Sequence, residues 1–369
     1  MSERRVDMKK CMLLIPRMGN GGAERVMATI ANNLCKNFDV CIVTLTDSKS
    51  FYNLNENIDI IGLGQSINRK NKCTYIMTAI VGGISAFFKL IRIIKYWKPD
   101  VILSFLQATN AIAIFLKLLG VKSRVVVSER CDPTVRSLLN RWFEYHFYRY
   151  ADAIVCQSSK VVGYFDSETQ KKVSIIPNML SADAIPSRFL GERRKCVVGI
   201  GRLDKQKNFS MLINAFAKLP KCFSDYTLEI YGGGNQEPIL KTQIAQCNMC
   251  GRIFLKGVTP NVMFSVADVA LYVMSSDFEG FPNALLEAMA TGLPVISTDF
   301  STGVARDLIH EENGKIIPVG DESALVEAMT ELLSNSDKWD AMSCENRKLL
   351  NKFSEEKIIS KWEEVLGLK

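Results

Sequence analysis

Glu279 and Glu287, separated by seven residues, lie in a stretch whose pattern can place both carboxylates beside a ligand. Apolar runs over 269–274 and 295–298 flank them, and such runs are typical of buried β-strands. A carboxylate just beyond the carboxyl end of a parallel strand faces the crevice in which such folds bind ligands. Glu279 is therefore placed to meet a substrate, and Glu287, in the following helix, to accept hydrogen bonds from ribose hydroxyls.

The helix between these two strands has clear end signals. Pro282 suits its first position, and Gly292 followed by Pro294 predicts its end. Backbone N–H groups at the positive end of this helix offer a seat for a phosphate. They belong to Gly280, Phe281 and Asn283. The simpler alternative is that Glu279 only complements the helix dipole and that Glu287 is solvated surface.

Two cations follow the first predicted strand of the second half of the chain. Arg202 and Lys207, five residues apart, lie after the run 196–201 and before a predicted helix over 209–219. Long cations at this edge of a sheet can converge on a diphosphate and neutralise the charge of a leaving group. Solvated surface charge is the alternative.

Glycine-rich turns end three other predicted strands. Gly21 and Gly22 follow the run 12–15, Gly234 closes a triple-glycine turn, and Val258 follows a strand over 253–255. Strand, glycine turn and helix form a geometry in which backbone amides approach a phosphate. The first turn matches neither a Walker loop nor a dinucleotide fingerprint, so a tight turn with no ligand is the alternative.

The segment from Glu279 to Pro282 and Glu287, continued by 288–295, resembles the Glu-x7-Glu motif of retaining glycosyltransferases of family GT4. These enzymes have the two-domain GT-B architecture. The resemblance covers nearly the whole chain and is strongest over 199–318. It implies that Glu279 contacts the transferred sugar and that Glu287 contacts the ribose of a UDP-sugar. It also implies retention of anomeric configuration by front-face attack, without a metal and with neither glutamate as nucleophile.

The resemblance extends the predicted site to both halves of the chain. It implies that Arg202 and Lys207 act with Glu279 in catalysis. The donor is expected to contact Gly21, Gly22, Arg202, Lys207, Gly234, Val258, Glu279, Gly280, Phe281, Pro282, Asn283 and Glu287. The acceptor is expected to contact Glu24, Arg25, Glu129 and Arg130.

Arg130 departs from the family pattern. Related transferases often carry a histidine beside the transferred sugar at this place, and neither His146 nor His310 falls in a motif that replaces it. The guanidinium of Arg130 can meet a donor or acceptor diphosphate. An ion pair within the surroundings of Glu129 is the alternative.

The order of predicted strands and helices indicates an α/β protein with two facing, doubly wound Rossmann-like domains and a cleft between them. We expect an acceptor-binding domain over 1–185 and a nucleotide-sugar-binding domain over 186–353. The remainder, 354–369, is predicted to be a helix that packs back on the first domain, as the resemblance implies.

Composition and charge narrow the function classes. The chain has 369 residues, 47% hydrophobic and 23% charged, with a net charge of +7, which suits an anionic surface or substrate. The 11 cysteines without a signal segment favour a reducing cytosol, and the isolated Cys247-x-x-Cys250 does not indicate a metal site. No apolar stretch is long enough to span a bilayer. Nothing beyond net charge supports nucleic-acid binding.

Two basic, aromatic helices are predicted in the first half. The end of the first, from Phe87 to Lys98, has apolar residues at helical spacing with recurring cations, which suits an anionic membrane interface. A packing helix with a solvated basic face is equally compatible with this pattern. The second, over 136–150, mixes arginines with aromatic residues and suits packing or an interfacial role.

We therefore expect a cytoplasmic enzyme, peripheral on the inner face of the bacterial cytoplasmic membrane. It would transfer a hexose or N-acetylhexosamine from a UDP-sugar to a polyprenyl-diphosphate-linked glycan of surface polysaccharide, and the motifs look closest to transferases acting on N-acetylgalactosamine-bearing carriers. Two alternatives keep the fold, a UDP-sugar epimerase and a transferase with a soluble acceptor. A third is a non-catalytic sugar-nucleotide-binding partner.

Overall fold

The computed structural model describes residues 8–65 and 72–369, and the chain divides into two compact units. The first comprises Met1–Pro177 and Glu356–Lys369, and the second comprises Asn178–Glu355. The division therefore falls earlier than the expected boundary between 185 and 186. The reason is that Leu180 and Ile185 are buried in the core of the second unit, where Leu180 also bridges to Ser354.

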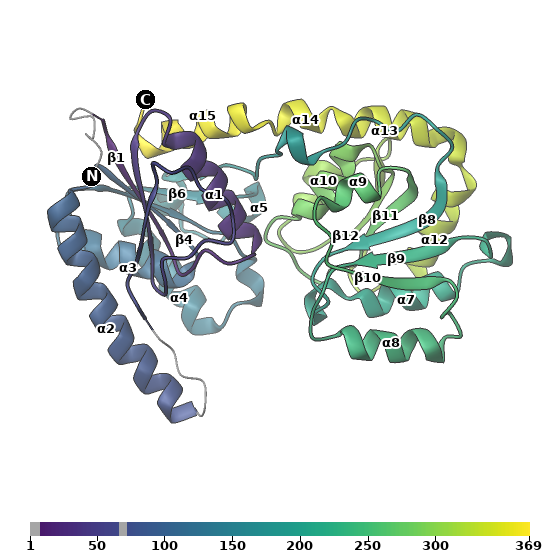
Figure 1. Cartoon of the computed structure of the whole chain (residues 1–369), viewed down its shortest axis with the longest axis horizontal. Helices are drawn as coiled ribbons and strands as arrows, with labels where there is room; N and C mark the ends of the chain where they lie inside the picture. The colour runs from purple at the N-terminus through teal and green to yellow at the C-terminus, as the bar shows by residue number, and fades with distance from the viewer. Residues whose placement is uncertain (1–7, 66–71) are drawn as a thin grey trace. The chain divides into compact units, whose positions relative to one another are not determined.

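The first unit contains a seven-stranded parallel sheet in the order β3-β2-β1-β4-β5-β6-β7 (Figure 1). Its strands are apolar runs covered on both faces, as expected for a parallel sheet. They are β1 (Lys10–Ile15), β2 (Asp39–Thr44), β3 (Asp59–Gly62), β4 (Val101–Phe105), β5 (Arg124–Ser128), β6 (Ala153–Cys156) and β7 (Val173–Ile175).

Helices flank this sheet on both faces. They are α1 (Gly22–Leu34), α2 (Lys72–Trp97), α3 (Gln107–Leu118), α4 (Leu138–Phe147), α5 (Ser159–Val162), α6 (Ser167–Gln170) and α15 (Glu355–Leu366). One core cluster joins a face of the sheet to buried residues of α2 and α3 and to Tyr148, which follows α4. In the C-terminal helix α15, Trp362 is fully buried with its ring 5.7 Å from that of Phe105 in β4.

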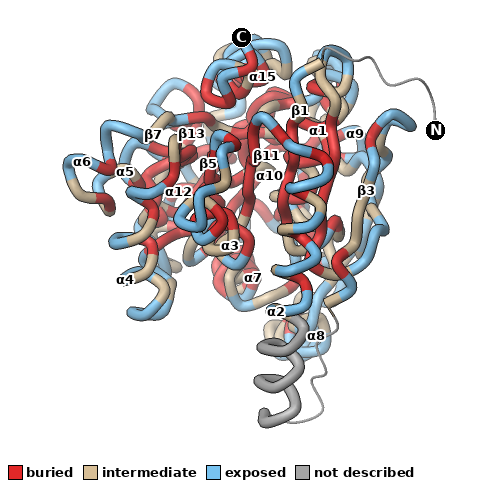
Figure 2. Tube along the Cα trace, turned by 90° about the vertical axis from the view of Figure 1, so that its left-hand side faces the viewer, coloured by how far each residue is buried: buried red, intermediate tan, exposed pale blue. Residues whose placement is uncertain are grey.

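The second unit repeats this plan with a six-stranded parallel sheet in the order β10-β9-β8-β11-β12-β13. Its strands are β8 (Arg194–Ile200), β9 (Thr227–Tyr231), β10 (Ile253–Gly257), β11 (Val269–Met274), β12 (Val295–Thr298) and β13 (Gly314–Ile317). Its helices are α7 (Phe209–Ala217), α8 (Glu237–Gln246), α9 (Val262–Ser265), α10 (Asn283–Thr291), α11 (Val304–Leu308), α12 (Glu322–Ser334), α13 (Trp339–Arg347) and α14 (Leu349–Lys352). The burial view shows buried strands under helices with exposed outer sides (Figure 2).

Each sheet has one point at which the chain reverses its direction of strand addition. In the first unit β1 lies between β2 and β4, and in the second β8 lies between β9 and β11. Open α/β sheets bind ligands beyond the carboxyl ends of the strands at such a switch point. The loops that follow β1, β4, β8 and β11 are therefore where each unit is expected to present its functional groups.

Candidate functional site

Lys207 and Glu279 form a buried ion pair at the switch point of the second unit. Lys207 follows β8 and Glu279 follows β11, and their Nζ and Oε1 atoms are 2.5 Å apart. Their side chains are only 15% and 8% exposed. The pair joins the loops at the carboxyl ends of these two neighbouring strands, and the sequence did not predict that the two charges meet.

Polar neighbours hold the Glu279 carboxylate in place. The Ser276 hydroxyl donates to Oε1 at 2.7 Å, and the Gln206 side chain donates to Oε2 at 3.3 Å and to the Phe278 carbonyl at 2.8 Å. The Thr302 hydroxyl donates to the backbone carbonyl of Glu279 at 3.1 Å. Oε2 carries the longer of these contacts, so it retains the greater capacity to accept from a ligand hydroxyl.

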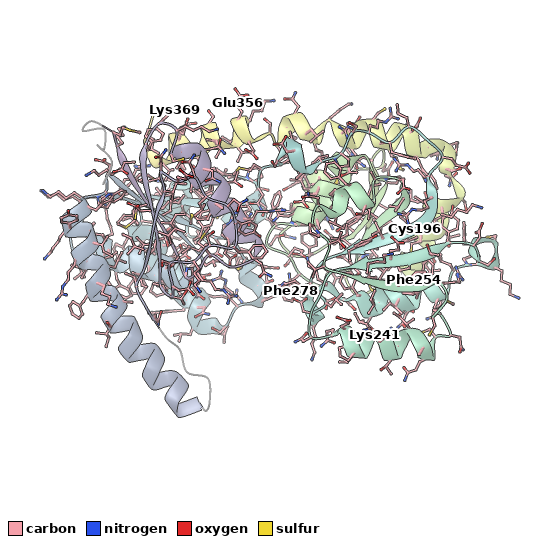
Figure 3. The ribbon with its side chains drawn as sticks, in the orientation of Figure 1. Cys196, Lys241, Phe254, Phe278, Glu356 and Lys369 are labelled. Carbon is pink, nitrogen blue, oxygen red and sulfur yellow. The ribbon has the colours of Figure 1, made fainter. Side chains whose placement is uncertain are left out.

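The loop after β8 is fixed in the same way. The Asp204 carboxylate accepts from the Lys207 backbone N–H at 3.3 Å, and the Ser275 hydroxyl donates to the Lys207 carbonyl at 2.9 Å. In Figure 3, Phe278 lies at one end of the second sheet and Cys196, near the start of β8, at the other. The cluster around Glu279 therefore occupies the carboxyl edge.

Arg202 stands beside this cluster but points toward solvent. Its side chain is 74% exposed, and its guanidinium contacts Asp204 at 3.2 Å and the Gln206 side-chain oxygen at 3.4 Å. An exposed guanidinium next to a buried ion pair can bind an incoming anion at little cost in desolvation.

The glycine turn after β9 packs against the loop that carries Arg202. A Cβ on Gly234 would lie 2.3 Å from the Leu203 carbonyl oxygen, and the Gly233 carbonyl accepts from the Leu203 N–H at 3.0 Å. Only glycine fits this approach of two backbones. Val258, after β10, is exposed close to Gly233. Both turns thus lie at the same carboxyl edge of the sheet as the loop after β8.

The N-terminus of α10 differs in detail from the predicted phosphate seat. The helix starts at Asn283, so Pro282 is its N-cap residue rather than its first residue, and the Asn283 N–H donates to the Phe281 carbonyl at 3.0 Å. Among the described residues, no backbone hydrogen bond is donated by the N–H groups of Gly280 and Phe281. These two groups lie at the positive end of α10.

Glu287 lies in the second turn of α10, as predicted, and is half-buried. Gly292 ends the helix with a φ of +90°, a conformation that favours glycine. Tyr272 is fully buried in β11, and this burial raises the pKa of its phenol. The negative charges of Glu279 and Glu287 raise it further. Both glutamates are therefore within electrostatic range of the same strand.

In the first unit, Glu24 closes over the glycine turn after β1. Its carboxylate is buried, and a Cβ on Gly21 would lie 2.3 Å from its Oε2. Gly22 begins α1, so the positive end of this helix already faces a carboxylate of the chain itself. A ligand hydroxyl suits such a surrounding better than a phosphate does. Arg25 follows in the first turn of α1, half-buried.

Glu129 pairs with Arg136, a residue that the sequence reasoning missed. Its Oε1 accepts from a guanidinium nitrogen of Arg136 and from the backbone N–H groups of Arg130 and Cys131, at 3.0 and 3.1 Å. The Tyr148 hydroxyl donates to Oε2 at 3.2 Å. The ion pair of Glu129 is thus made with Arg136, and Glu129 anchors the loop after β5 instead of facing solvent.

Arg136 also pairs with Glu144 of α4, so two buried carboxylates share one guanidinium. Burial, and next the charge of Glu129, raise the pKa of Glu144 to about 8. Burial also raises the pKa of Glu129, while Arg136 and the hydrogen bonds to its carboxylate act in the opposite direction.

Arg130 is buried, with its guanidinium 4.6 Å from the centre of the Phe105 ring. Burial lowers its pKa to about 9. The negative charge of the nearby Glu129 opposes this shift.

The described part of the chain contains neither a cluster of metal ligands nor a membrane-spanning helix. Among those residues, no three histidine, cysteine or acidic side chains are placed to hold a metal ion together. Over the same described ranges, no helix combines the length and apolarity needed to cross a membrane.

Comparison with known sequences identifies relatives over the full length of the chain. Residues 183–349 match the family described as "Glycosyl transferases group 1", and residues 20–183 match "Glycosyltransferase Family 4". The chain is 30% identical over 350 residues to N-acetylgalactosamine-N,N'-diacetylbacillosaminyl-diphospho-undecaprenol 4-alpha-N-acetylgalactosaminyltransferase from Campylobacter jejuni, which covers 89% of this chain and 91% of the relative. A second transferase from that organism, GalNAc-alpha-(1->4)-GalNAc-alpha-(1->3)-diNAcBac-PP-undecaprenol alpha-1,4-N-acetyl-D-galactosaminyltransferase, is 27% identical over 92% of this chain and 93% of its own length.

Solved structures show the same fold. The apo form of the lipopolysaccharide outer core galactosyltransferase WaaB matches with a TM-score of 0.76 at 17% identity, over 97% of this chain and 99% of that one. Anabaena HepE in complex with UDP-glucose matches with a TM-score of 0.79 at 17% identity, over 98% and 100%. These matches confirm the predicted GT-B fold with its two Rossmann-like domains. A relative at 30% identity along nearly its whole length, together with family matches in both halves, establishes that the chain belongs to the group 1 glycosyltransferases.

Proposed function

We propose that this chain is a retaining glycosyltransferase that moves a hexose or N-acetylhexosamine from a UDP-sugar to a polyprenyl-diphosphate-linked glycan in bacterial surface-polysaccharide biosynthesis. The observation that carries the proposal is the buried Lys207–Glu279 pair at the switch point of the second unit, with the exposed Arg202 beside it. The names of the two Campylobacter jejuni relatives support a lipid-linked acceptor, and they make N-acetylgalactosamine the first donor sugar to test.

The proposed donor site uses the carboxyl edge of the second sheet. Glu279 would bind hydroxyls of the transferred sugar through Oε2, and Glu287 the ribose. Arg202 and Lys207 would neutralise the diphosphate, which is where negative charge develops as the donor breaks down. The N–H groups of Gly280 and Phe281 add donors at the positive end of α10. Because these cations and dipoles supply the charge, we expect transfer without a metal ion.

The proposed reaction is front-face displacement at the anomeric carbon. The acceptor hydroxyl oxygen forms a bond to that carbon while the bond to the β-phosphate oxygen breaks. The hydroxyl proton passes to an oxygen of the departing UDP, which leaves as the diphosphate held by Arg202 and Lys207. Glu279 remains paired with Lys207 and acts as a sugar-binding group, not as a nucleophile.

The first unit would supply the acceptor contacts. Glu24, at the glycine turn, suits a hydroxyl of the acceptor glycan, and Arg25 and Arg130 suit its diphosphate. Glu129 is saturated by four donors, so we propose that it acts by holding Arg130 and its loop in place.

A peripheral location on the inner face of the cytoplasmic membrane would bring the enzyme to this acceptor. The Phe87–Lys98 part of α2 supports it, because Phe88 and Tyr96 are exposed on the same stretch as Lys95 and Lys98. Aromatic rings and cations together suit an anionic interface.

The direct test is a screen of UDP-sugars for UDP release by the purified chain, with and without lipid-linked acceptors. We expect release that depends on a lipid-linked acceptor and falls at least about 100-fold in Glu279→Gln. Release with a soluble sugar acceptor alone, or isomerisation of the donor without release, would favour the two same-fold alternatives. UDP-sugar binding without any turnover would favour a non-catalytic binding role.

A further inference from the structure

Unlike an ordinary surface helix, helix α4 turns an acidic side chain toward the protein and apolar side chains toward solvent. Its one buried residue is the carboxylate-bearing Glu144, whereas Leu138 and Leu139 are 81% and 74% exposed. Trp142, at 54%, and Tyr145 are exposed with them. Figure 2 shows α4 mostly in the colours of exposed and intermediate residues. We call the outer surface formed by Leu138, Leu139, Trp142 and Tyr145 the α4 face.

Specific interactions fix this orientation. Arg136 holds Glu144 inward, with both side chains less than a tenth exposed, and the same guanidinium pairs with Glu129 after β5. On the other side, the rings of Phe143 and Phe147 stack at 4.8 Å and both lie 6.1 Å from Phe115 of α3. Turning α4 to bury its leucines would expose these rings and break the Arg136–Glu144 pair, so the α4 face is held outward by the fold.

The charge of this segment suits an anionic partner. Between residues 133 and 150 the only acidic side chain is the buried Glu144. The exposed basic groups of this segment are Arg141, His146 and Arg149, of which Arg149 pairs with the Asp166 carboxylate at 3.1 Å. Exposed leucines with a tryptophan and a tyrosine, and cations at the edge, are the composition of surfaces that dock into anionic bilayer interfaces.

A bilayer fits this surface better than a single lipid chain does. The hollow of about 300 Å³ beside α4 has Glu129 and Glu144 in its wall, which is unfavourable for an isolated apolar chain. Leu138, Trp142 and Tyr145 of the α4 face line the same hollow, and their exposed sides face solvent. The neighbouring helix α3 also exposes Leu118 and Leu119, and it shares a core cluster with α2, so these helices cover the same face of the sheet.

We propose that the α4 face is a membrane-seating surface, which inserts Leu138, Leu139 and Trp142 into the interface of an anionic bilayer. This inference rests on the proposed function, because a polyprenyl-linked acceptor is presented at such an interface. It assigns the apolar anchor to α4 and the electrostatic attraction to residues 87–98 at the end of α2.

Trp142 provides a built-in probe. The chain has four tryptophans, and the other three, Trp97, Trp339 and Trp362, are buried. Adding vesicles of phosphatidylglycerol and phosphatidylethanolamine should shift the emission to shorter wavelength and allow quenching by brominated lipids. Trp142→Phe should keep vesicle binding and lose this signal. Unchanged emission at saturating vesicle binding would overturn the proposal.

Co-sedimentation with the same vesicles tests the anchor. Leu138→Ser/Leu139→Ser should weaken vesicle partitioning by about tenfold or more. Loss of one leucine from an apolar environment already lowers a binding constant by about tenfold. The matched control is Leu190→Ser/Ile239→Ser, which changes two exposed residues of the second unit, with Leu190 77% exposed, and should bind as the wild type does. Equal partitioning of both double variants would overturn the proposal.

Two further measurements distinguish membrane seating from self-association of the chain and from a failure of the proposed function. If the α4 face is instead an interface between two copies, light scattering will show a dimer. Leu138→Ser/Leu139→Ser would then convert the dimer to a monomer and leave vesicle binding intact, and the proposal fails.

Transfer to a short-chain, water-soluble acceptor should be unaffected by this variant. Absence of transfer in every protein, with vesicle results as expected, would reject the proposed function and leave the seating surface standing.

Discussion

Replacing Lys207 by methionine leaves the Glu279 carboxylate buried without its cation. The two side chains are 15% and 8% exposed and 2.5 Å apart, so the change belongs to the class that removes one partner of a buried pair. Such changes cost about 3–5 kcal/mol. Ser276 and Gln206 still donate to the carboxylate, which favours the lower end, about 3 kcal/mol. For a unit of this size that corresponds to a melting temperature lower by roughly 6–12 °C.

The double variant Lys207→Met/Glu279→Gln sharpens the prediction. It leaves no charge at the buried positions 207 and 279, so we expect it to be more stable than Lys207→Met alone by about 2 kcal/mol, although it carries an additional substitution. Transfer activity should behave differently and stay at least about 100-fold reduced in both, because the diphosphate loses its cation.

Scanning calorimetry of the two variants and of the wild type measures the stability effect, and UDP release measures activity. Lys205→Met is the matched control, because Lys205 is exposed on the same short helical turn and its replacement should change stability by less than about 0.5 kcal/mol. If the double variant is less stable than Lys207→Met, the unpaired charge of Glu279 is not what destabilises Lys207→Met, and the prediction is wrong.

Three other predictions follow from single contacts. Arg202→Met should leave unfolding unchanged, since the side chain is largely exposed, and weaken UDP binding about 10–100-fold by calorimetric titration. Gly234→Ala should lower the free energy of unfolding by about 1–3 kcal/mol in a urea titration, because its methyl group would meet the Leu203 carbonyl; full stability would contradict the described turn. The folded-state pKa of Glu144 lies at about 8, above its unfolded value of about 4.3, so the folded state holds a proton that the unfolded state has released. Its stabilising contribution is complete below about pH 4.3 and is lost as the pH rises through about 8, and Glu144→Gln should flatten that part of the urea-stability profile.

Local patterns in the sequence were sufficient for the secondary structure around the site. The strand over 269–274, the helix end at Gly292 and the position of Glu287 in the second turn all agree with the structure. These features depend on a few adjacent residues, whose apolar runs, prolines and glycines act over short distances.

Contacts between distant parts of the chain could not be predicted from local sequence patterns. Nothing local indicates that Lys207 pairs with Glu279, or that Arg136 pairs with Glu129. Helical spacing showed that 136–150 has apolar and polar positions, but it could not show that Glu144 turns inward. Which face of a helix is buried is decided by its partners, here the shared guanidinium of Arg136.

The most direct test of the proposed donor site is a crystal structure of the full chain with a bound UDP-sugar. We expect the diphosphate within contact distance of Arg202 and Lys207, a sugar hydroxyl hydrogen-bonded to Glu279, and the ribose at Glu287. A UDP-sugar that binds with its diphosphate away from the loops after β8 and β11 would contradict it.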